Sequence, residues 1–339
     1  MIPKRLLLLL FSVICIINTA FADPHPETAA GIFDSLFPRR ELNTSLLGVN
    51  AFVNDSRFGS IQSQLLEVKN TLGLKYIRIL INWDDNVQPT PTSLPNFAFY
   101  DEIIKNIPSG VSAVAVVTGL PSWMSDSTNW IAGDPRSTFV KRWLTKVAKR
   151  YAKKSKLKAI QVWKEPNDDG NNENIILDLS ASPANYVSML RQARPLIRKY
   201  GKKKVVNAAT TSIAQNYPDS LNYNKDLKAA GIESLVDYFA IHFYGSSYER
   251  LYLPGGIVDF LEKIKKPIWV TESGKQGVLE QLEYAEKTWP QLKELIPRIN
   301  KIFIYQFTDS QAAEDSWGLR TLDSQFPISD LYLWLRDHN

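Results

Sequence analysis

The chain has 339 residues, of which 44% are hydrophobic and 22% are charged. This ordinary globular composition argues against a disordered chain and provides enough apolar residues for one large core or two modest ones. The formal net charge of +5 is too small to predict a nucleic-acid-binding protein.

The N-terminal stretch, residues 1–22, predicts a secretory signal peptide. Lys4 and Arg5 precede an apolar run of about 13 residues, and Ala20–Ala22 (AFA) has the small-x-small pattern of a cleavage site. A membrane anchor is the alternative, but the run is shorter than the roughly 20 residues that span a bilayer. We therefore expect a secreted or periplasmic protein with no membrane span after cleavage, which lowers the net charge to about +3.

Few residues are available for metal or thiol chemistry. The single cysteine, Cys15, lies in the predicted leader, so the mature chain would contain no thiol nucleophile, disulfide or thiolate metal site. The three histidines are His25, His242 and His338, and two of them lie near the termini, which leaves no histidine cluster for a metal. The sequence also lacks a phosphate loop, a dinucleotide fingerprint and a nucleophile elbow. We expect neither a metal nor another cofactor.

After an N-terminal segment, residues 23–45, short β-branched apolar runs alternate with longer amphipathic stretches. The predicted strands are LLGVNAFV near 46, KYIRILINW near 75, VSAVAVVTG near 111, LKAIQVW near 157, KKVVNAATT near 203, VDYFAIHFYG near 236, KPIWVTESG near 266 and NKIFIYQFTD near 300. The predicted helices span residues 60–72, 97–105, 135–153, 183–200, 219–230, 257–265, 278–295 and 329–336. Proline or a capping residue precedes or opens several of them.

This repeated alternation predicts an α/β fold with a parallel sheet, closed as a (β/α)8 TIM barrel in a single domain over residues 46–339. An open doubly wound sheet is the alternative, although no glycine-rich loop follows the first strand. In a barrel of this kind, functional residues lie at the carboxyl ends of the strands. Polar and aromatic residues indeed close most of the predicted strands.

Charged residues divide between the two ends of the predicted barrel. The runs KRYAKKSKLK, YGKKKV and EKIKKP precede strands four, five and seven, whereas aspartates and glutamates follow strands two, four and eight. The lysine runs are either a solvated surface or a surface that adheres to an anionic envelope. The acidic end would be the catalytic one, which disfavours a polyanionic substrate there.

Two carboxylates end strands that face one another across the barrel mouth. Glu165 ends strand four and Glu272 ends strand seven. Glycosidic bond cleavage requires one protonated carboxyl group and one ionised carboxylate, and a separation of about 5 to 5.5 Å would give a retaining enzyme. If Glu165 is the acid, its pKa should lie above the roughly 4.3 of a free glutamate.

The segments around these residues carry a family resemblance. VWKEPN resembles the W-N-E-P-N acid/base segment of the clan A glycoside hydrolases, and PIWVTESG is similar to their nucleophile segment on strand seven. The similarity extends in order to YIRILINW, to PSWM followed by STNWIAGDPRSTFVKRW, to DYFAIHFYG, and to IFIYQFTD followed by SWGL. Among these enzymes the chain most resembles the family 39 type, which includes bacterial exopolysaccharide and oligosaccharide hydrolases.

The resemblance implies roles for individual residues. Glu165 would be the acid/base and Glu272 the nucleophile, while Arg78 and Tyr244 would hydrogen-bond Glu272 and His242 would shape the same site. Structural roles for Arg78, in an ion pair inside the barrel, and for His242, in the core, are the alternatives. The resemblance also places Asn167 among the substrate-binding residues. The aromatic residues expected to pack on sugar faces are Trp83, Trp123, Trp163 and Trp317.

Lys164 departs from the family pattern, which has asparagine before the acid/base to contact the sugar 2-hydroxyl. Lysine has donors but no acceptor, and its charge would lower the pKa of Glu165. It could bind the 2-hydroxyl or a substituent, turn outward into an ion pair, or weaken the site.

We therefore expect an exported, monomeric, retaining glycosidase that acts on a neutral or lightly substituted poly- or oligosaccharide, with no nucleic-acid partner. A weakened barrel that only binds glycans is the alternative. Transglycosylation shares the same intermediate, and the sequence does not separate it from hydrolysis.

Overall fold

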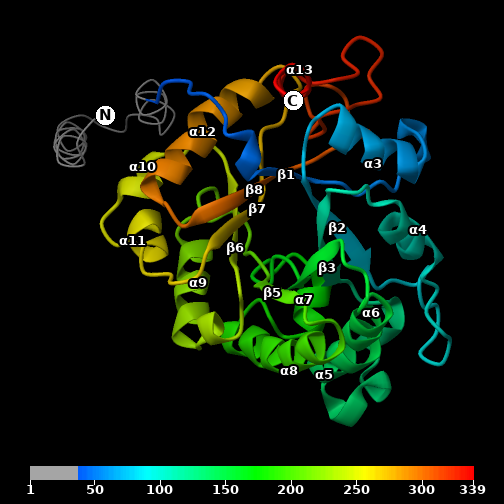
Figure 1. Ribbon diagram of the computed structural model, residues 1–339. Helices are drawn as coiled ribbons and strands as arrows, with labels where there is room; N and C mark the ends of the chain where they lie inside the picture. The colour runs from blue at the N-terminus through cyan, green and yellow to red at the C-terminus, as the bar shows by residue number, and fades with distance from the viewer. Residues whose placement is uncertain (1–36) are drawn as a thin grey trace.

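Eight parallel strands form the centre of the molecule in the computed structural model, which describes residues 37–339 (Figure 1). The predicted leader lies outside the described residues. The strands are β1 (Leu47–Asn50), β2 (Tyr76–Asn82), β3 (Ser112–Thr118), β4 (Leu157–Val162), β5 (Lys204–Asn207), β6 (Phe239–Tyr244), β7 (Ile268–Gly274) and β8 (Ile299–Ile304). Their order around the sheet is β5-β4-β3-β2-β1-β8-β7-β6, so β1 lies between β2 and β8. The predicted (β/α)8 barrel is confirmed.

The barrel closes between β5 and β6 through few backbone contacts. Val206 and Tyr238 form an isolated parallel bridge there. The side chain of Asn207 extends this seam, because its Oδ1 accepts from Ala240 N at 2.8 Å and its Nδ2 donates to Ala240 O at 3.1 Å. A buried amide therefore replaces ladder hydrogen bonds at the point where the barrel closes.

Helices surround the strands and follow them in chain order (Figure 1). They are α3 (Ile61–Asn70), α4 (Ala98–Asn106), α5 (Pro135–Thr138), α6 (Thr145–Arg150), α7 (Asn172–Ile176), α8 (Pro183–Gly201), α9 (Asp219–Ala229), α10 (Glu249–Tyr252), α11 (Ile257–Leu261), α12 (Gln281–Leu295) and α13 (Asp330–Asp337). A π-helical segment, Phe139–Leu144, joins α5 to α6. No helix within residues 37–339 combines the length and the hydropathy needed to cross a membrane.

Local sequence explains where several helices begin. Ser60 and Ser329 cap α3 and α13 by accepting hydrogen bonds from backbone N–H groups, and Asp134 caps α5 ahead of Pro135. The short helices α7 and α10 lie within segments that sequence periodicity predicts as loops. Each is less than two turns long, too short for an apolar period to show.

The core has two parts. The larger part packs the outer faces of the strands against the helices, and the smaller part fills the lower interior of the barrel. The interior part contains Val114, Ala159, Val206, Ala209, Ala240, Trp269 and Phe303. Above it the buried side chains become polar, with Asn50, Arg78 and Gln161 in hydrogen-bond contact. This polar layer is the floor of the candidate active site.

Candidate active site

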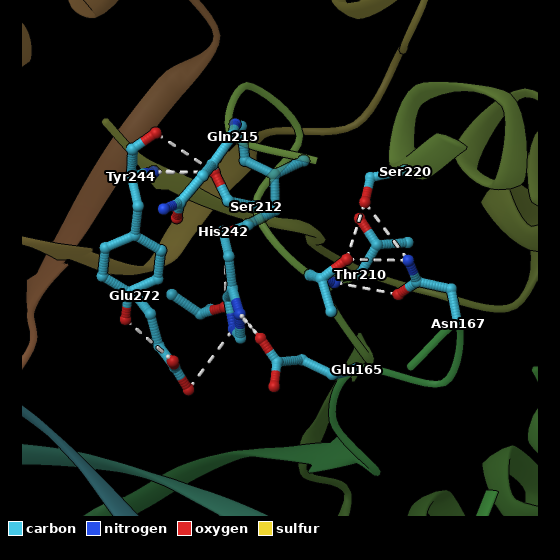
Figure 2. A network of polar contacts seen from close by, with 12 residues as sticks. Glu165, Asn167, Thr210, Ser212, Gln215, Ser220, His242, Tyr244 and Glu272 are labelled. Carbon is cyan, nitrogen blue, oxygen red and sulfur yellow. Dashed lines mark hydrogen bonds and ion pairs between the residues drawn. The ribbon is translucent and has the colours of Figure 1, made fainter. Parts of the chain in front are cut away.

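Glu165, His242 and Glu272 meet at the carboxyl ends of β4, β6 and β7 (Figure 2). His242 Nδ1 lies 3.0 Å from Glu165 Oε1, and His242 Nε2 lies 3.4 Å from Glu272 Oε1. The imidazole is fully buried between the two carboxylates. One oxygen of each glutamate and one ring nitrogen of His242 lie within 4.8 Å of one another. The two glutamates can therefore reach the same small group from two sides.

Glu272 is held by hydrogen bonds to both of its carboxylate oxygens. Arg78 Nη1 donates to Oε1 at 2.7 Å, and Tyr244 Oη donates to Oε2 at 3.0 Å. Arg78 is itself positioned by Gln161 Oε1 at 2.9 Å and Asn50 Oδ1 at 2.5 Å. These are the contacts that the resemblance predicts for Arg78 and Tyr244. Burial and the neighbouring negative charge of Glu272 raise the pKa of Tyr244 well above its usual value, which keeps it a hydrogen-bond donor.

The expected high pKa of Glu165 is wrong for the unliganded protein. Burial acts to raise this pKa, but the hydrogen bond with His242 and the positive charges of His242, Lys164 and Arg78 outweigh it and lower the pKa to about 2. The groups that act against burial, His242, Lys164 and Arg78, favour the ionised carboxylate of Glu165. The sequence indicated the lowering effect of Lys164 but not the larger one of His242, because the contact between Glu165 and His242 joins residues 77 positions apart.

The backbone at the end of β4 is bent so that Glu165 points into the site. Trp163 and Glu165 have φ angles of 73° and 42°, in the left-handed region that favours glycine. Asn174 holds this turn, because its Oδ1 accepts from Trp163 Nε1 at 2.7 Å and its Nδ2 donates to Glu165 O at 2.8 Å and to Asp168 O at 2.7 Å. Sequence reasoning missed Asn174, which lies in a polar stretch without a distinguishing pattern.

Lys164 lies half-buried between Glu165 and Glu173. Within residues 37–339 its ammonium group has no hydrogen bond or ion pair, which contradicts the interpretation that it turns outward into an ion pair. Glu173 accepts a hydrogen bond from Leu120 N at 3.0 Å. Burial raises the pKa of Glu173, against the lowering effect of the Lys164 charge. Lys164 therefore remains available to a ligand.

The structure separates the predicted aromatic residues into two groups. Trp83 and Trp163 are fully buried, and their Nε1 atoms donate to Gln88 and Asn174. The prediction that they contact substrate is wrong, because the ends of β2 and β4 turn them into the core beneath the mouth. An alternating strand pattern does not distinguish a core face from a sugar-binding face.

Trp123 and Trp317 keep partly exposed rings. Trp123 Nε1 donates to Gln88 O, and the Arg142 guanidinium lies 5.6 Å from its ring centre. Trp317 packs edge-on against Tyr244 with a centroid distance of 5.1 Å, which places it beside the hydrogen-bond donor to Glu272.

Asn167 does not present its amide to the mouth. Its Nδ2 donates to Thr211 Oγ1 at 2.8 Å and to Ser220 Oγ at 3.2 Å, and its Oδ1 accepts from Thr211 N at 2.9 Å. Both donor hydrogens are thus used within the protein. These hydrogen bonds join the loop after β4 to the loop after β5, and the substrate contact of Asn167 stays a prediction.

The donor set of Glu165, His242 and Glu272 also has the spacing of a metal site. Both oxygens of Glu272, however, already accept from Arg78 and Tyr244. A cation at Glu272 would compete with the Arg78 guanidinium 2.7 Å away. The arrangement fits a carboxyl group held by protein donors better than a metal ligand.

Two hollows of about 440 Å³ each adjoin Phe52 and Asn54, in the loop after β1. One reaches Asp84 after β2 and the side chains of α4, and the other reaches Asp309 after β8. Neither hollow is lined by Glu165, His242 or Glu272.

Several solved structures share this fold. A family 39 glycoside hydrolase from Bacteroides cellulosilyticus is 15% identical, with a TM-score of 0.59, and the match covers 88% of this chain and 64% of that one. A monomeric β-xylosidase from Caulobacter crescentus is 14% identical, with a TM-score of 0.61 and coverage of 88% and 69%. The GH5_18 enzyme from Streptomyces cattleya, solved with Manβ1-4GlcNAc, is 14% identical, with a TM-score of 0.61 and coverage of 89% and 80%.

At these identities the structural likeness concerns the fold, and this chain spans less than two thirds of the Bacteroides enzyme. A search of curated proteins finds no match. The model of the cellulase family, glycosyl hydrolase family 5, matches residues 39–296, which is most of the chain. The expected membership of clan A is confirmed. The chain belongs to glycosyl hydrolase family 5.

Proposed function

We propose that the protein cleaves β-linked glycans by double displacement with retention of configuration. Glu272 attacks the anomeric carbon while Glu165 gives its proton to the leaving oxygen, and Glu165 then takes a proton from the water that releases the sugar. The observation that carries this proposal is that a carboxyl oxygen of Glu165 and a carboxyl oxygen of Glu272 lie within 4.8 Å of each other. Retaining enzymes separate these groups by about 5 to 5.5 Å, whereas inverting enzymes need about 6.5 to 9.5 Å.

Neighbouring groups support the assignment of the two roles. Arg78 and Tyr244 donate to the two oxygens of Glu272, which holds its carboxylate in the fixed orientation that a nucleophile needs. Glu165 lacks a comparable pair of donors and has His242 as its close polar partner. A sugar bound in the mouth displaces water and buries Glu165 further, which favours its protonated form before the first step.

The proposed substrate is a neutral or lightly substituted poly- or oligosaccharide. We assign further sugar units to the two hollows beside Phe52 and Asn54, which are lined partly by the loops after β1, β2 and β8. The partly exposed ring of Trp317 provides an apolar surface for a sugar face. The names of the similar structures, a β-xylosidase and an enzyme solved with a mannosyl-β-1,4 disaccharide, are the basis for proposing a β-linkage. We further propose that the protein is exported and acts as a monomer.

The first experiment is product release from a panel of plant, fungal and bacterial polysaccharides, analysed by mass spectrometry. We expect Glu272→Gln to lower kcat at least about 10⁴-fold and Glu165→Gln to lower it about 10²- to 10⁴-fold. Glu314→Gln, an exposed change on the same rim, is the matched control. Proton NMR of the first product should show the retained anomer. Inversion, or full activity in Glu272→Gln, would contradict the mechanism.

A glycan-binding protein without strong catalysis is the second candidate. The favouring observation is the position of Glu165 beside His242, 3.0 Å away, and Lys164, because both lower its pKa against the effect of burial and so oppose its role as an acid. Binding of a glycan with no product, unchanged in Glu165→Gln, would support this candidate over hydrolysis.

A further inference from the structure

A cluster of lysines lies at the end of the barrel opposite the active site. These residues precede or begin β4 and β5, whereas Glu165 and Glu272 lie at the carboxyl ends of their strands. The lysine cluster consists of Lys153, Lys154, Lys158, Lys202, Lys203 and Lys204.

The pairing of β4 with β5 brings the two lysine runs together. In the ladder Ala159 pairs with Lys204, which places Lys158 beside Lys203. Lys203 Nζ donates to Lys154 O at 2.7 Å. Burial and the nearby positive charge of Lys158 lower the pKa of Lys203. The fold therefore holds the positive charges of Lys158 and Lys203 close together, and their repulsion lowers the stability of the folded chain.

Acidic residues do little to balance the cluster. Of its members, only Lys204 forms an ion pair within the described part of the chain, to Asp237 at 3.6 Å. Asp237 already accepts from Arg198 at 2.5 Å. The side chains of Lys153, Lys154, Lys158 and Lys202 are exposed. The positive field of this face is thus directed into solvent.

The positive surface continues onto the adjoining helices. Lys149 of α6 and Lys199 of α8 place their Nζ atoms 4.9 Å and 5.5 Å from the centre of the Tyr200 ring. The large exposed apolar residues of the described chain all lie in other segments. Contact through this face would therefore depend on charge rather than on apolar insertion.

We propose that the lysine cluster is a docking surface for an anionic phospholipid bilayer, on which the barrel rests with its catalytic mouth facing away. Two features favour a lipid surface over other polyanions. Lysine provides point charges without the fork with which arginine recognises individual phosphates, which suits a diffuse anionic plane. A polysaccharide bound at this face would also lie at the wrong end of the barrel to reach Glu165.

The test is co-sedimentation of the full chain with vesicles of phosphatidylcholine alone or with about 30% phosphatidylglycerol, at low salt. We expect stronger binding to the anionic vesicles and release as salt is raised. Lys4 and Arg5 beside the apolar N-terminal run also attract anionic lipid, so the contribution of the lysine cluster is read from variants that all keep this segment. Activity plays no part in this measurement, so the result is independent of the proposed hydrolase function.

Charge-neutralising variants locate the surface. The triple variant Lys153→Gln, Lys158→Gln, Lys202→Gln should lose on the order of a hundredfold in anionic-vesicle partitioning, at about fivefold per lysine. The control Lys141→Gln, Lys225→Gln, Lys275→Gln removes the same charge from exposed positions elsewhere and should lose only a few-fold. Thermal melting checks that both variants fold.

Three results would overturn the proposal. The first is equal binding of the wild type to neutral and anionic vesicles. The second is an equal loss in the two triple variants, which would assign any attraction to net charge alone. The third is displacement of the protein from vesicles by duplex DNA at a lower phosphate concentration than that of the lipid, which would identify a nucleic acid as the preferred partner.

Discussion

Lys164 places a positive charge directly beside the acid/base residue of the proposed reaction. The charge lies close to both Glu165 and Glu173: with His242 it lowers the pKa of Glu165 against the effect of burial, whereas at Glu173 burial outweighs it and the pKa is raised. A general acid works best with a pKa near the working pH. The enzyme as it stands should therefore be most active on the acidic side of neutrality.

Replacing Lys164 tests this effect. We expect Lys164→Asn to raise the pKa of Glu165 and to move the alkaline limb of the pH–rate profile to higher pH, because a cation that favours the carboxylate has been removed. Lys164→Arg, which keeps the charge, is the control and should leave the limb in place. An unchanged limb in Lys164→Asn would show that its charge does not act on Glu165.

The lowered pKa of Glu165 also predicts how stability depends on pH. A carboxyl group whose pKa falls from about 4.3 in the unfolded chain to about 2 in the folded one stabilises the fold above the higher value. This contribution is lost as the pH falls through that range. Denaturant unfolding at pH 7 and pH 3 should therefore show a smaller acid-induced loss in Glu165→Gln than in the wild type.

The control for this measurement is Glu102→Gln, an exposed change on α4. It should lose as much stability on acidification as the wild type does. Equal losses in all three proteins would mean that Glu165 has the same pKa in the folded and unfolded chain.

At individual positions, the sequence predicted which side chains meet in the site better than it predicted which side chains are exposed to solvent. The structure brings the motif residues into contact, namely Arg78, Tyr244, His242 and the two glutamates. Trp83 and Trp163 are not at the surface, because whether an aromatic residue at a strand end faces sugar or core depends on the turn that follows. That turn at β4 is held by Asn174, whose role depends on three long-range contacts absent from any local pattern.

Among the elements, the seam between β5 and β6 is the weakest part of the barrel wall. Its single backbone bridge is supplemented by the Asn207 side chain, which exchanges hydrogen bonds with Ala240 at 2.8 Å and 3.1 Å. Asn207→Ala leaves the N–H and C=O of Ala240 buried without these partners. We expect a loss of roughly 2 to 5 kcal/mol in the free energy of unfolding.

Hydrogen exchange measured by mass spectrometry can locate this effect. Peptides that contain β6 should exchange faster in Asn207→Ala, while peptides from β2 and β3, which pair along their full lengths, should keep their protection. A uniform increase across all strands would indicate general destabilisation rather than an open seam.

The elements themselves could be predicted where their patterns are long. The strands appear in the predicted order because each is a β-branched run bounded by polar residues, as in β3 and β7. The short helices α7 and α10 and the π-helical segment Phe139–Leu144 could not be predicted. They form within loops or within a longer helix, where tertiary packing rather than periodicity decides the local structure.

At the scale of the whole molecule, acidic and basic residues occupy opposite ends of the barrel. The lysine cluster lies at the amino ends of β4 and β5, while acidic residues follow several strands at the mouth. Those acidic residues are Asp84, Asp85, Asp168, Asp169, Asp309, Glu314 and Asp315. This separation could be predicted from sequence because each loop belongs to one end of a (β/α)8 barrel.

The acidic mouth predicts discrimination between substrates by charge. A neutral polysaccharide should be cleaved with a higher kcat/KM than its carboxymethylated derivative at low salt, since the negative potential repels the modified chain. Raising the salt concentration should narrow the difference by screening. A preference for the carboxymethylated chain at low salt would instead indicate that Lys164 recruits anionic groups.

The left-handed backbone at Glu165 has a consequence for how this protein can change. With φ at 42°, the position suits glycine better than any residue with a side chain. Glu165→Gly would relieve the backbone strain but would also remove the contact with His242 that stabilises the folded chain above about pH 4.3, so the two effects on heat resistance oppose one another. Libraries intended to stabilise the enzyme should hold the turn after β4 constant and seek their gains elsewhere.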